Sequence, residues 1–122
     1  MPLANGLMPV DGSGNVAPAS QTNENYQYPG PFSTISASPS GGGVVWVLDN
    51  SNCATDDCGG AGLSAAILRA YNASDLGTTL YSSSTVSSDA AASAIKYTQP
   101  VIANGHVYVG GSSAVTVYGL QP

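Results

Sequence analysis

The oxygen-rich loop DNSNCATDD, residues 49–57, holds the side chains best suited to chemistry in this sequence. Carboxylate and amide oxygens are the ligands that a hard cation such as Ca²⁺ prefers. The spacing does not match an EF-hand loop, and the glycine of its sharp turn is absent, so a solvated hairpin loop is the alternative interpretation. The candidate cation ligands are Asp49, Asn50, Asn52, Asp56 and Asp57.

The same loop contains both cysteines of the chain, Cys53 and Cys58, with four residues between them. A close, even pair in a secreted chain is typical of a local disulfide, which stabilises modestly because the closed loop is short. A metal site needs four suitable ligands, and the chain adds only one distant histidine. We therefore expect a disulfide between Cys53 and Cys58, with free thiols or a metal site as alternatives.

The remaining reactive side chains do not make a catalytic set. His106 is the single histidine and follows Asn104-Gly105, so we expect it on the surface beside a turn. No acid is placed by spacing to complete a Ser-His-Asp triad. Asp56 and Asp57 are neighbours in a loop, where adjacent side chains point apart. The sequence thus predicts no catalytic residue within this chain.

Composition narrows the partners and the compartment. The 122 residues include two Lys or Arg and carry a net charge of −5, with 7% charged residues. A nucleic-acid partner needs clustered cations and is excluded on that ground, and anionic membrane surfaces are disfavoured for the same reason. No stretch of 18 apolar residues predicts a transmembrane helix. Gly, Ser, Ala, Thr and Asn occupy the polar positions, which favours a secreted location, extracellular or periplasmic. Asn72-Ala73-Ser74 is an N-glycosylation sequon.

The elements that position these residues are predicted to be β-strands. Short runs of β-branched and aromatic residues alternate with glycine-rich or Asp/Asn-rich turns, and no segment shows a sustained helical period, so the class is all-β. Asn104-Gly105 predicts a tight hairpin because a type I′ turn needs positive φ at both positions. Gly110–Ser113 predicts a second, looser hairpin. Pro100 lacks a backbone donor and should mark an edge, bulge or break. The expected strands are 33–38, 43–50, 65–72, 78–82, 94–103, 106–110 and 114–120.

The expected organisation has four parts. Residues 1–32 are rich in Pro, Gly and Asn and read as a connecting segment, whose aromatics Tyr26, Tyr28 and Phe32 pin it to a neighbouring surface. Residues 33–84 hold four strands with the cysteine loop as an insertion, and residues 94–122 hold three. Residues 85–93 form the linker between them, which we expect to be a loop, although one turn of helix would fit.

The two strand groups are similar to each other. ISASPSGGGVVWVL matches VIANGHVYVG as a strand, a glycine-bearing turn and an apolar-aromatic strand, and AILRAYN matches AVTVYGL. A repeated antiparallel unit of several tens of residues is the signature of propeller blades.

A family resemblance adds to this pattern. LRAYNASDLGTTLYSSS resembles the blade signature of the PQQ-like, quinoprotein-type β-propellers, and TQPVIANGHVYVGGSSAVTVYGL looks like the last blade of their secreted bacterial members. Asn72 stands where such blades usually have Asp, and Tyr81 where they usually have Trp, so the signature is divergent. The residues that carry it are Arg69, Ala70, Tyr71, Asn72, Asp75, Leu76, Gly77, Leu80 and Tyr81.

The resemblance implies one complete blade, 33–84, and a terminal blade, 94–122, that lacks its fourth strand. In such propellers the last blade often borrows a strand, because an open ring exposes sheet edges. We expect Val115, Val117 and Tyr118 to form the edge that another blade, another copy or the stretch NGLMPV of this chain completes.

The function expected from the sequence is therefore a non-catalytic, secreted structural or binding module that assembles by strand pairing with further blades or with copies of itself. One alternative is the C-terminal part of a quinoprotein-type oxidoreductase, whose PQQ and Ca²⁺ would be held by other blades. A second alternative is a surface adhesion or glycan-binding module that uses Tyr26 or Tyr28. No cofactor is expected within this chain itself.

Overall fold

The computed structural model describes residues 6–7, 12–14, 18–53 and 64–119, and this part of the chain is all-β. It contains strands and two single-turn 3-10 helices, η1 (Ser51–Cys53) and η2 (Ser87–Asp89). The strands are β1 (Gly6–Leu7), β2 (Ser20–Gln21), β3 (Phe32–Ala37), β4 (Gly43–Asp49), β5 (Ile67–Asn72), β6 (Asp75–Ser82), β7 (Val101–Ala103), β8 (His106–Gly110) and β9 (Val115–Gly119).

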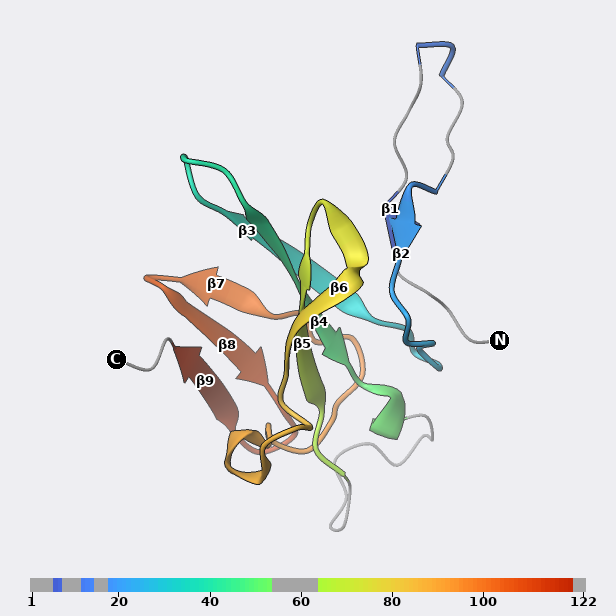
Figure 1. Cartoon of the computed structure of the whole chain (residues 1–122). Coiled ribbons are helices and arrows are strands. Elements are labelled where there is room, and N and C mark those ends of the chain that lie inside the picture. Colours follow the sequence, from blue (N-terminus) through green and yellow to red (C-terminus); the bar gives the residue numbers. More distant parts are fainter. Residues whose placement is uncertain (1–5, 8–11, 15–17, 54–63, 120–122) are drawn as a thin grey trace.

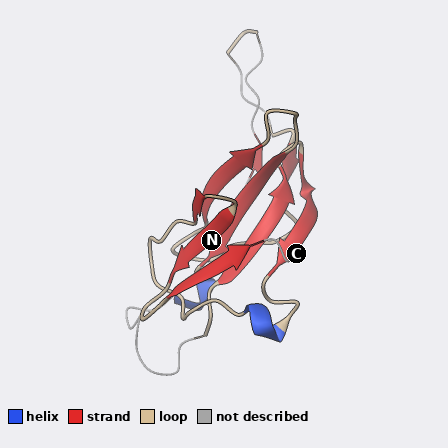
Figure 2. Ribbon diagram, turned by 90° about the vertical axis from the view of Figure 1, so that its left-hand side faces the viewer, coloured by secondary structure: helices blue, strands red, loops and turns tan. Residues whose placement is uncertain are grey.

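The strands form three antiparallel sheets, each a simple meander. Strands β3 to β6 make a four-stranded sheet, β7 to β9 make a three-stranded sheet, and β1 pairs with β2. In Figure 1 the four-stranded sheet lies between the three-stranded sheet on one side and the β1–β2 pair on the other. The two helical turns lie at the same end of the sheets, as Figure 2 shows. The expected all-β class is confirmed.

Side chains along β4 point alternately to the two faces of the four-stranded sheet, and each face packs against its own hydrophobic core. Trp46 and Leu48 lie opposite Ala70 and Leu68 of β5 and face the three-stranded sheet, because residues directly opposite each other share a face. Val47 points the other way and is fully buried. The main core between the sheets holds Leu48, Cys53, Ala66, Leu68, Ala91, Ala94, Val107 and Val109.

The N-terminal segment builds the second core on the opposite face of β4 and β5. Tyr26 is fully buried there with Val47, Tyr71 and Leu76. Backbone contacts with β6 reinforce this layer, since Ser20 Oγ accepts a hydrogen bond from the backbone nitrogen of Leu76 at 3.0 Å. The expectation that aromatics pin this segment is therefore confirmed for Tyr26.

The turns follow the local sequence closely. Asn104 and Gly105 have φ of 50° and 74°, the positive pair that a type I′ turn needs, and they join β7 directly to β8. The looser connection from β8 to β9 closes with a hydrogen bond from the Gly111 backbone nitrogen to the Ala114 carbonyl at 2.9 Å. Both predicted hairpins are confirmed.

The predicted strand 94–103 is wrong in its first seven positions. Strand β7 begins at Val101, directly after Pro100. Proline cannot donate to a ladder, and Tyr97 has a φ of 65°, which an extended strand does not allow. The buried Pro100 instead offers its carbonyl to Thr34 Oγ1 of β3 at 2.7 Å, which ties the two sheets together.

Smaller differences concern the other boundaries. Strand β5 begins at Ile67, with Ala65 making an isolated bridge to Ser93. Strand β6 begins at Asp75, earlier than the expected 78, and bulges against β5. The linker, expected to be a loop, contains the single helical turn η2 instead. Among the described residues, no helix is long and apolar enough to cross a membrane.

The stretch NGLMPV does not complete the three-stranded sheet through its described residues. Gly6 and Leu7 pair with Gln21 and Ser20 instead. This pair lies on the far side of the four-stranded sheet from β9 (Figure 1). The proposal that this stretch fills the vacant place beside β9 is therefore wrong for Gly6–Leu7.

Candidate functional site

The described members of the candidate cation site are used within the protein. The two carboxylate oxygens of Asp49 accept hydrogen bonds from Arg69 Nη1, at 2.7 Å, and from Ser51. The Asn50 amide nitrogen donates to Thr98 Oγ1 at 3.2 Å, and that of Asn52 donates to the Ala65 carbonyl at 2.7 Å. A cation at Asp49 would have to displace Arg69.

The rest of that candidate site leaves one acceptor open. Asn50 is fully buried, and its Oδ1 has no hydrogen-bond partner among the described residues. Asp56 and Asp57 lie outside the described residues. The described part of the chain holds no group of three or more His, Cys, Asp or Glu side chains placed to bind a metal.

Only one of the two cysteines of the predicted disulfide is among the described residues. Cys53 ends η1 and is fully buried in the main core, whereas Cys58 lies outside the described residues. The disulfide stays a prediction. The sequon residue Asn72 ends β5, and its Oδ1 accepts a hydrogen bond from the Ser74 backbone nitrogen at 2.9 Å.

His106 occupies the exposed turn-edge position expected of it. Its Nδ1 lies 2.8 Å from the Asn104 carbonyl, and its ring covers Gly119 of β9. A Cβ at Gly119 would approach the ring to 2.9 Å, so a larger residue there would make the exposed ring move. Nothing in these contacts prepares His106 for catalysis.

A buried chain of hydroxyls joins the N-terminal segment to β5. Tyr71 donates its hydroxyl hydrogen to Glu24 Oε2 at 2.8 Å. The hydroxyls of Tyr26 and Tyr71 are 2.6 Å apart. Because a phenol has one hydrogen and that of Tyr71 goes to Glu24, Tyr26 must be the donor of the second bond. The order of donation is Tyr26 to Tyr71 to Glu24.

Burial sets the electrostatics of this chain of hydroxyls. It raises the pKa of Tyr26 and that of Tyr71, and the hydrogen bond that Tyr71 donates to Glu24 raises the pKa of Tyr71 further. Arg69 lies 5.8 Å from the Tyr26 ring centroid. Burial opposes its charge, but the hydrogen bond and charge of Asp49 outweigh burial and raise the pKa of Arg69. Both tyrosines are fully buried, so this cluster holds the layer in place.

The outer face of the three-stranded sheet is apolar and exposed. Val101 and Val117 both lie opposite Tyr108, which places all three on the face directed away from the main core. Val101, Val115 and Val117 are 58%, 64% and 50% exposed. Within the described residues, no strand pairs with the second edge of β9.

One member of the expected assembly edge belongs elsewhere. Tyr118 alternates with Val117 and points inward, where its hydroxyl donates to the Asp89 carbonyl at 2.8 Å. Val115 and Val117 therefore lie exposed on the outer face. Tyr118 lies between the two sheets and packs against the main core. The period of two along β9 could have predicted this division.

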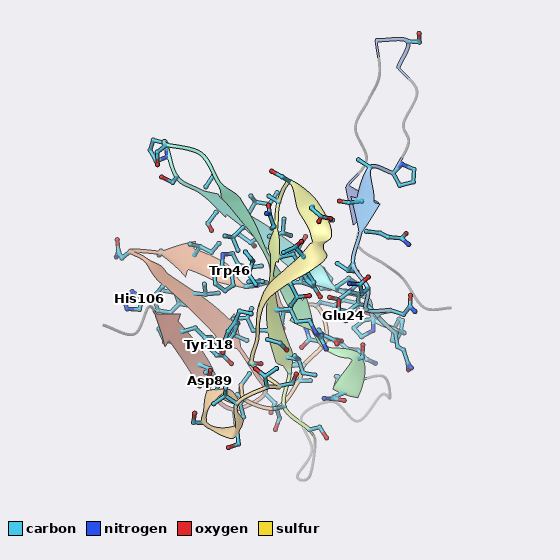
Figure 3. All side chains as sticks on the ribbon, in the orientation of Figure 1. Glu24, Trp46, Asp89, His106 and Tyr118 are labelled. Atoms are coloured by element: carbon cyan, nitrogen blue, oxygen red, sulfur yellow. The ribbon has the colours of Figure 1, made fainter. Side chains whose placement is uncertain are left out.

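A groove opens between the two larger sheets, and Tyr118 is one of its lining residues. It has a volume of about 660 Å³, within the range of small-molecule sites. Figure 3 shows Trp46, Tyr118 and Asp89 on one side of the four-stranded sheet and Glu24 on the other. The lining residues are Trp46, Tyr81, Val86, Ser88, Asp89, Gly105, Val107, Val117, Tyr118 and Gly119.

Two of the aromatic side chains in this groove meet at Asp89. The Tyr81 hydroxyl donates to Asp89 Oδ2 at 2.9 Å, and its ring packs edge-on against Tyr118 with centroids 6.2 Å apart. Burial raises the pKa of both phenols, and the hydrogen bond to Asp89 raises that of Tyr81 further. Sequence reasoning missed this groove, because its walls come from β4, β6, η2, β8 and β9.

Of the two tyrosines that could bind a glycan, one is buried and one is exposed. Tyr26 has no exposed ring face, whereas Tyr28 is 55% exposed and bonds through its hydroxyl to that of Tyr97 at 2.9 Å. A glycan-binding role through these residues would rest on Tyr28.

The comparisons with known proteins identify no relative. No protein-family model matches the chain, and neither a curated protein nor a solved structure shows significant similarity to it. The resemblance of the sequence to quinoprotein-type propellers therefore stays a prediction.

Proposed function

We propose that the chain is a non-catalytic, secreted structural module that joins another β-sheet through β9 and the outer face of the three-stranded sheet. The observation that carries this proposal is the exposure of Val101, Val115 and Val117 on one face. Proteins commonly protect a free edge strand with charged side chains or proline. Strand β9, with the sequence VTVYG, has neither.

The two sheets support a propeller-like arrangement as the context. A four-stranded meander packs against a three-stranded one, so the second sheet is one strand shorter than the first. Another blade of a longer protein, or a second copy of this chain, would supply the missing strand and cover the valines. The outer face brings no charged side chain to such a contact, because its residues are Val101, Ala103, His106, Tyr108, Gly110, Val115, Val117 and Gly119.

When the chain is the only protein in solution, the sheet that can dock on β9 has to come from a second copy of the chain. We therefore expect concentration-dependent self-association, measured by sedimentation velocity. Full burial of a valine stabilises by about 1.5 kcal/mol. With 64% of Val115 and 50% of Val117 left to bury, the pair contributes about 1.7 kcal/mol for each copy. The double substitution Val115→Lys/Val117→Lys should weaken a symmetric dimer by roughly 300-fold.

The matched control changes an equally exposed apolar side chain on the other sheet. Ile35 of β3 is 67% exposed, and Ile35→Lys adds charge without touching the outer face of β7 to β9. This variant should associate like the unaltered chain. A chain that stays monomeric at the highest concentrations, or that loses association equally through Ile35→Lys, would argue against the proposed role of β9.

A further inference from the structure

Three aromatic side chains, Trp46, Tyr81 and Tyr118, line the groove between the sheets. Trp46 and Tyr81 lie on either side of Ala70, which pairs with both across the sheet. Trp46 and Tyr81 both line the groove, whereas Ala70 between them is covered, with 2% of its surface exposed. Tyr118 approaches from the opposite sheet and packs edge-on against Tyr81.

The side chains with polar hydrogens that line this groove already donate them within the protein. The Trp46 indole donates to Ser36 Oγ at 2.9 Å, and Ser88 donates to Asp89 Oδ1 at 3.2 Å. Tyr81 and Tyr118 donate to the carboxylate and carbonyl of Asp89. These four are the lining side chains with polar hydrogens. The groove is lined by aromatic rings, valine side chains and the Asp89 carboxylate, and of these the rings and the carboxylate attract positive charge.

Charge supports the same ligand class. Asp89 is the one ionisable carboxylate among the lining residues, and the chain carries a net charge of −5. Neither of the two basic residues, Arg69 and Lys96, lines the groove. A neutral sugar needs both donors and acceptors, and an anion needs donors, so the lining side chains suit neither of these as well as a cation.

We propose that this groove binds a small organic cation of the quaternary ammonium class, held between Trp46, Tyr81 and Tyr118 and facing Asp89. A quaternary ammonium group donates no hydrogen bond and is recognised through ring faces. The groove shares one residue, Val117, with the outer valine face, so binding is measured at a protein concentration below self-association.

The direct test compares choline with dimethylbutanol, the uncharged isostere in which carbon replaces the nitrogen. Trp46 is the single tryptophan of the chain, so its fluorescence reports binding in the groove. We expect choline to bind with a dissociation constant of about a millimolar. Dimethylbutanol should bind about tenfold more weakly, because shape is retained and charge is lost.

Two variants locate the effect. Asp89→Asn removes the charge and keeps an oxygen for Tyr81, and it should weaken choline about fivefold while leaving dimethylbutanol unchanged. Asp75→Asn is the matched control, because it removes the same charge from an exposed strand end outside the groove, and it should change nothing. Tyr118→Leu should bring the two dissociation constants close together.

Three results would overturn the proposal. Equal affinity for choline and dimethylbutanol would make the groove an apolar cleft without preference for charge. The absence of any fluorescence change with either compound, confirmed by calorimetry on protein with a native circular dichroism spectrum, would leave no site. An equal effect of Asp75→Asn and Asp89→Asn would assign choline binding to general charge attraction.

Discussion

Substituting phenylalanine in the buried hydroxyl chain should affect stability in an order set by the direction of donation. Tyr26 gives its hydrogen to Tyr71, and Tyr71 gives its own to Glu24. Tyr26→Phe removes one hydrogen bond and leaves Tyr71 with an unused acceptor, which costs about 1 kcal/mol. Tyr71→Phe removes both bonds and strands the Tyr26 hydroxyl, which is fully buried.

The expected magnitude for Tyr71→Phe is about 3 kcal/mol. Roughly 2 kcal/mol comes from the buried Tyr26 donor that loses its acceptor. The lost bond to Glu24 adds about 1 kcal/mol, because that carboxylate is partly exposed and regains water. The double variant Tyr26→Phe/Tyr71→Phe has no stranded donor, so it should be about 1 kcal/mol more stable than Tyr71→Phe alone.

Urea unfolding followed by Trp46 fluorescence, at a protein concentration below self-association, measures all three free energies of unfolding. Tyr28→Phe serves as a control, since the Tyr28 hydroxyl bonds to Tyr97 at an exposed position. If Tyr26→Phe were as costly as Tyr71→Phe, or if the double variant were the least stable, the assigned direction of donation would be wrong.

Two further perturbations test the packing. Gly111→Ala would bring a Cβ within 2.5 Å of Ala92 Cβ and 2.8 Å of the Ser93 carbonyl oxygen, and should cost about 2 kcal/mol. The adjacent Gly110→Ala meets nothing within 4 Å, so thermal unfolding should show little change, and equal losses would refute the packing. Burial raises the folded-state pKa of four tyrosines, so their stabilising effect is present below about pH 10 and falls as pH rises above it. A urea midpoint that is constant from about pH 8 to about pH 11 would contradict this pH dependence.

Local signals in the sequence were enough for most of the strands. Alternating β-branched and aromatic residues predicted β4, β8 and β9 nearly to the residue, and Asn104-Gly105 predicted the turn between β7 and β8. These elements follow from the side-chain period and the backbone preferences of a few neighbouring residues. The sequence allows Pro100 to be an edge, a bulge or a break, and it does not show that the residues before it are outside the strand.

Interactions between distant segments could not be predicted in the same way. Tyr26 and Tyr71 are 45 residues apart and Arg69 and Asp49 are 20 apart, and nothing local to either pair marks the other partner. From the sequence alone, Asp49 is interpreted as a cation ligand. In the structure its carboxylate is paired with the Arg69 guanidinium instead. The aromatic lining of the groove had no local sign, because Trp46, Tyr81 and Tyr118 come from three strands far apart in the sequence.

Amide hydrogen exchange along β9 tests the central claim most directly. The amides on the free edge of Val115–Gly119 have no strand beside them in the described structure. If another sheet docks there, their exchange should slow as the protein concentration rises over about a hundredfold range, while the free edge of β3 is unaffected. Exchange in β9 that is the same at every concentration, in a sample that associates, would show that the copies join elsewhere and would contradict the account.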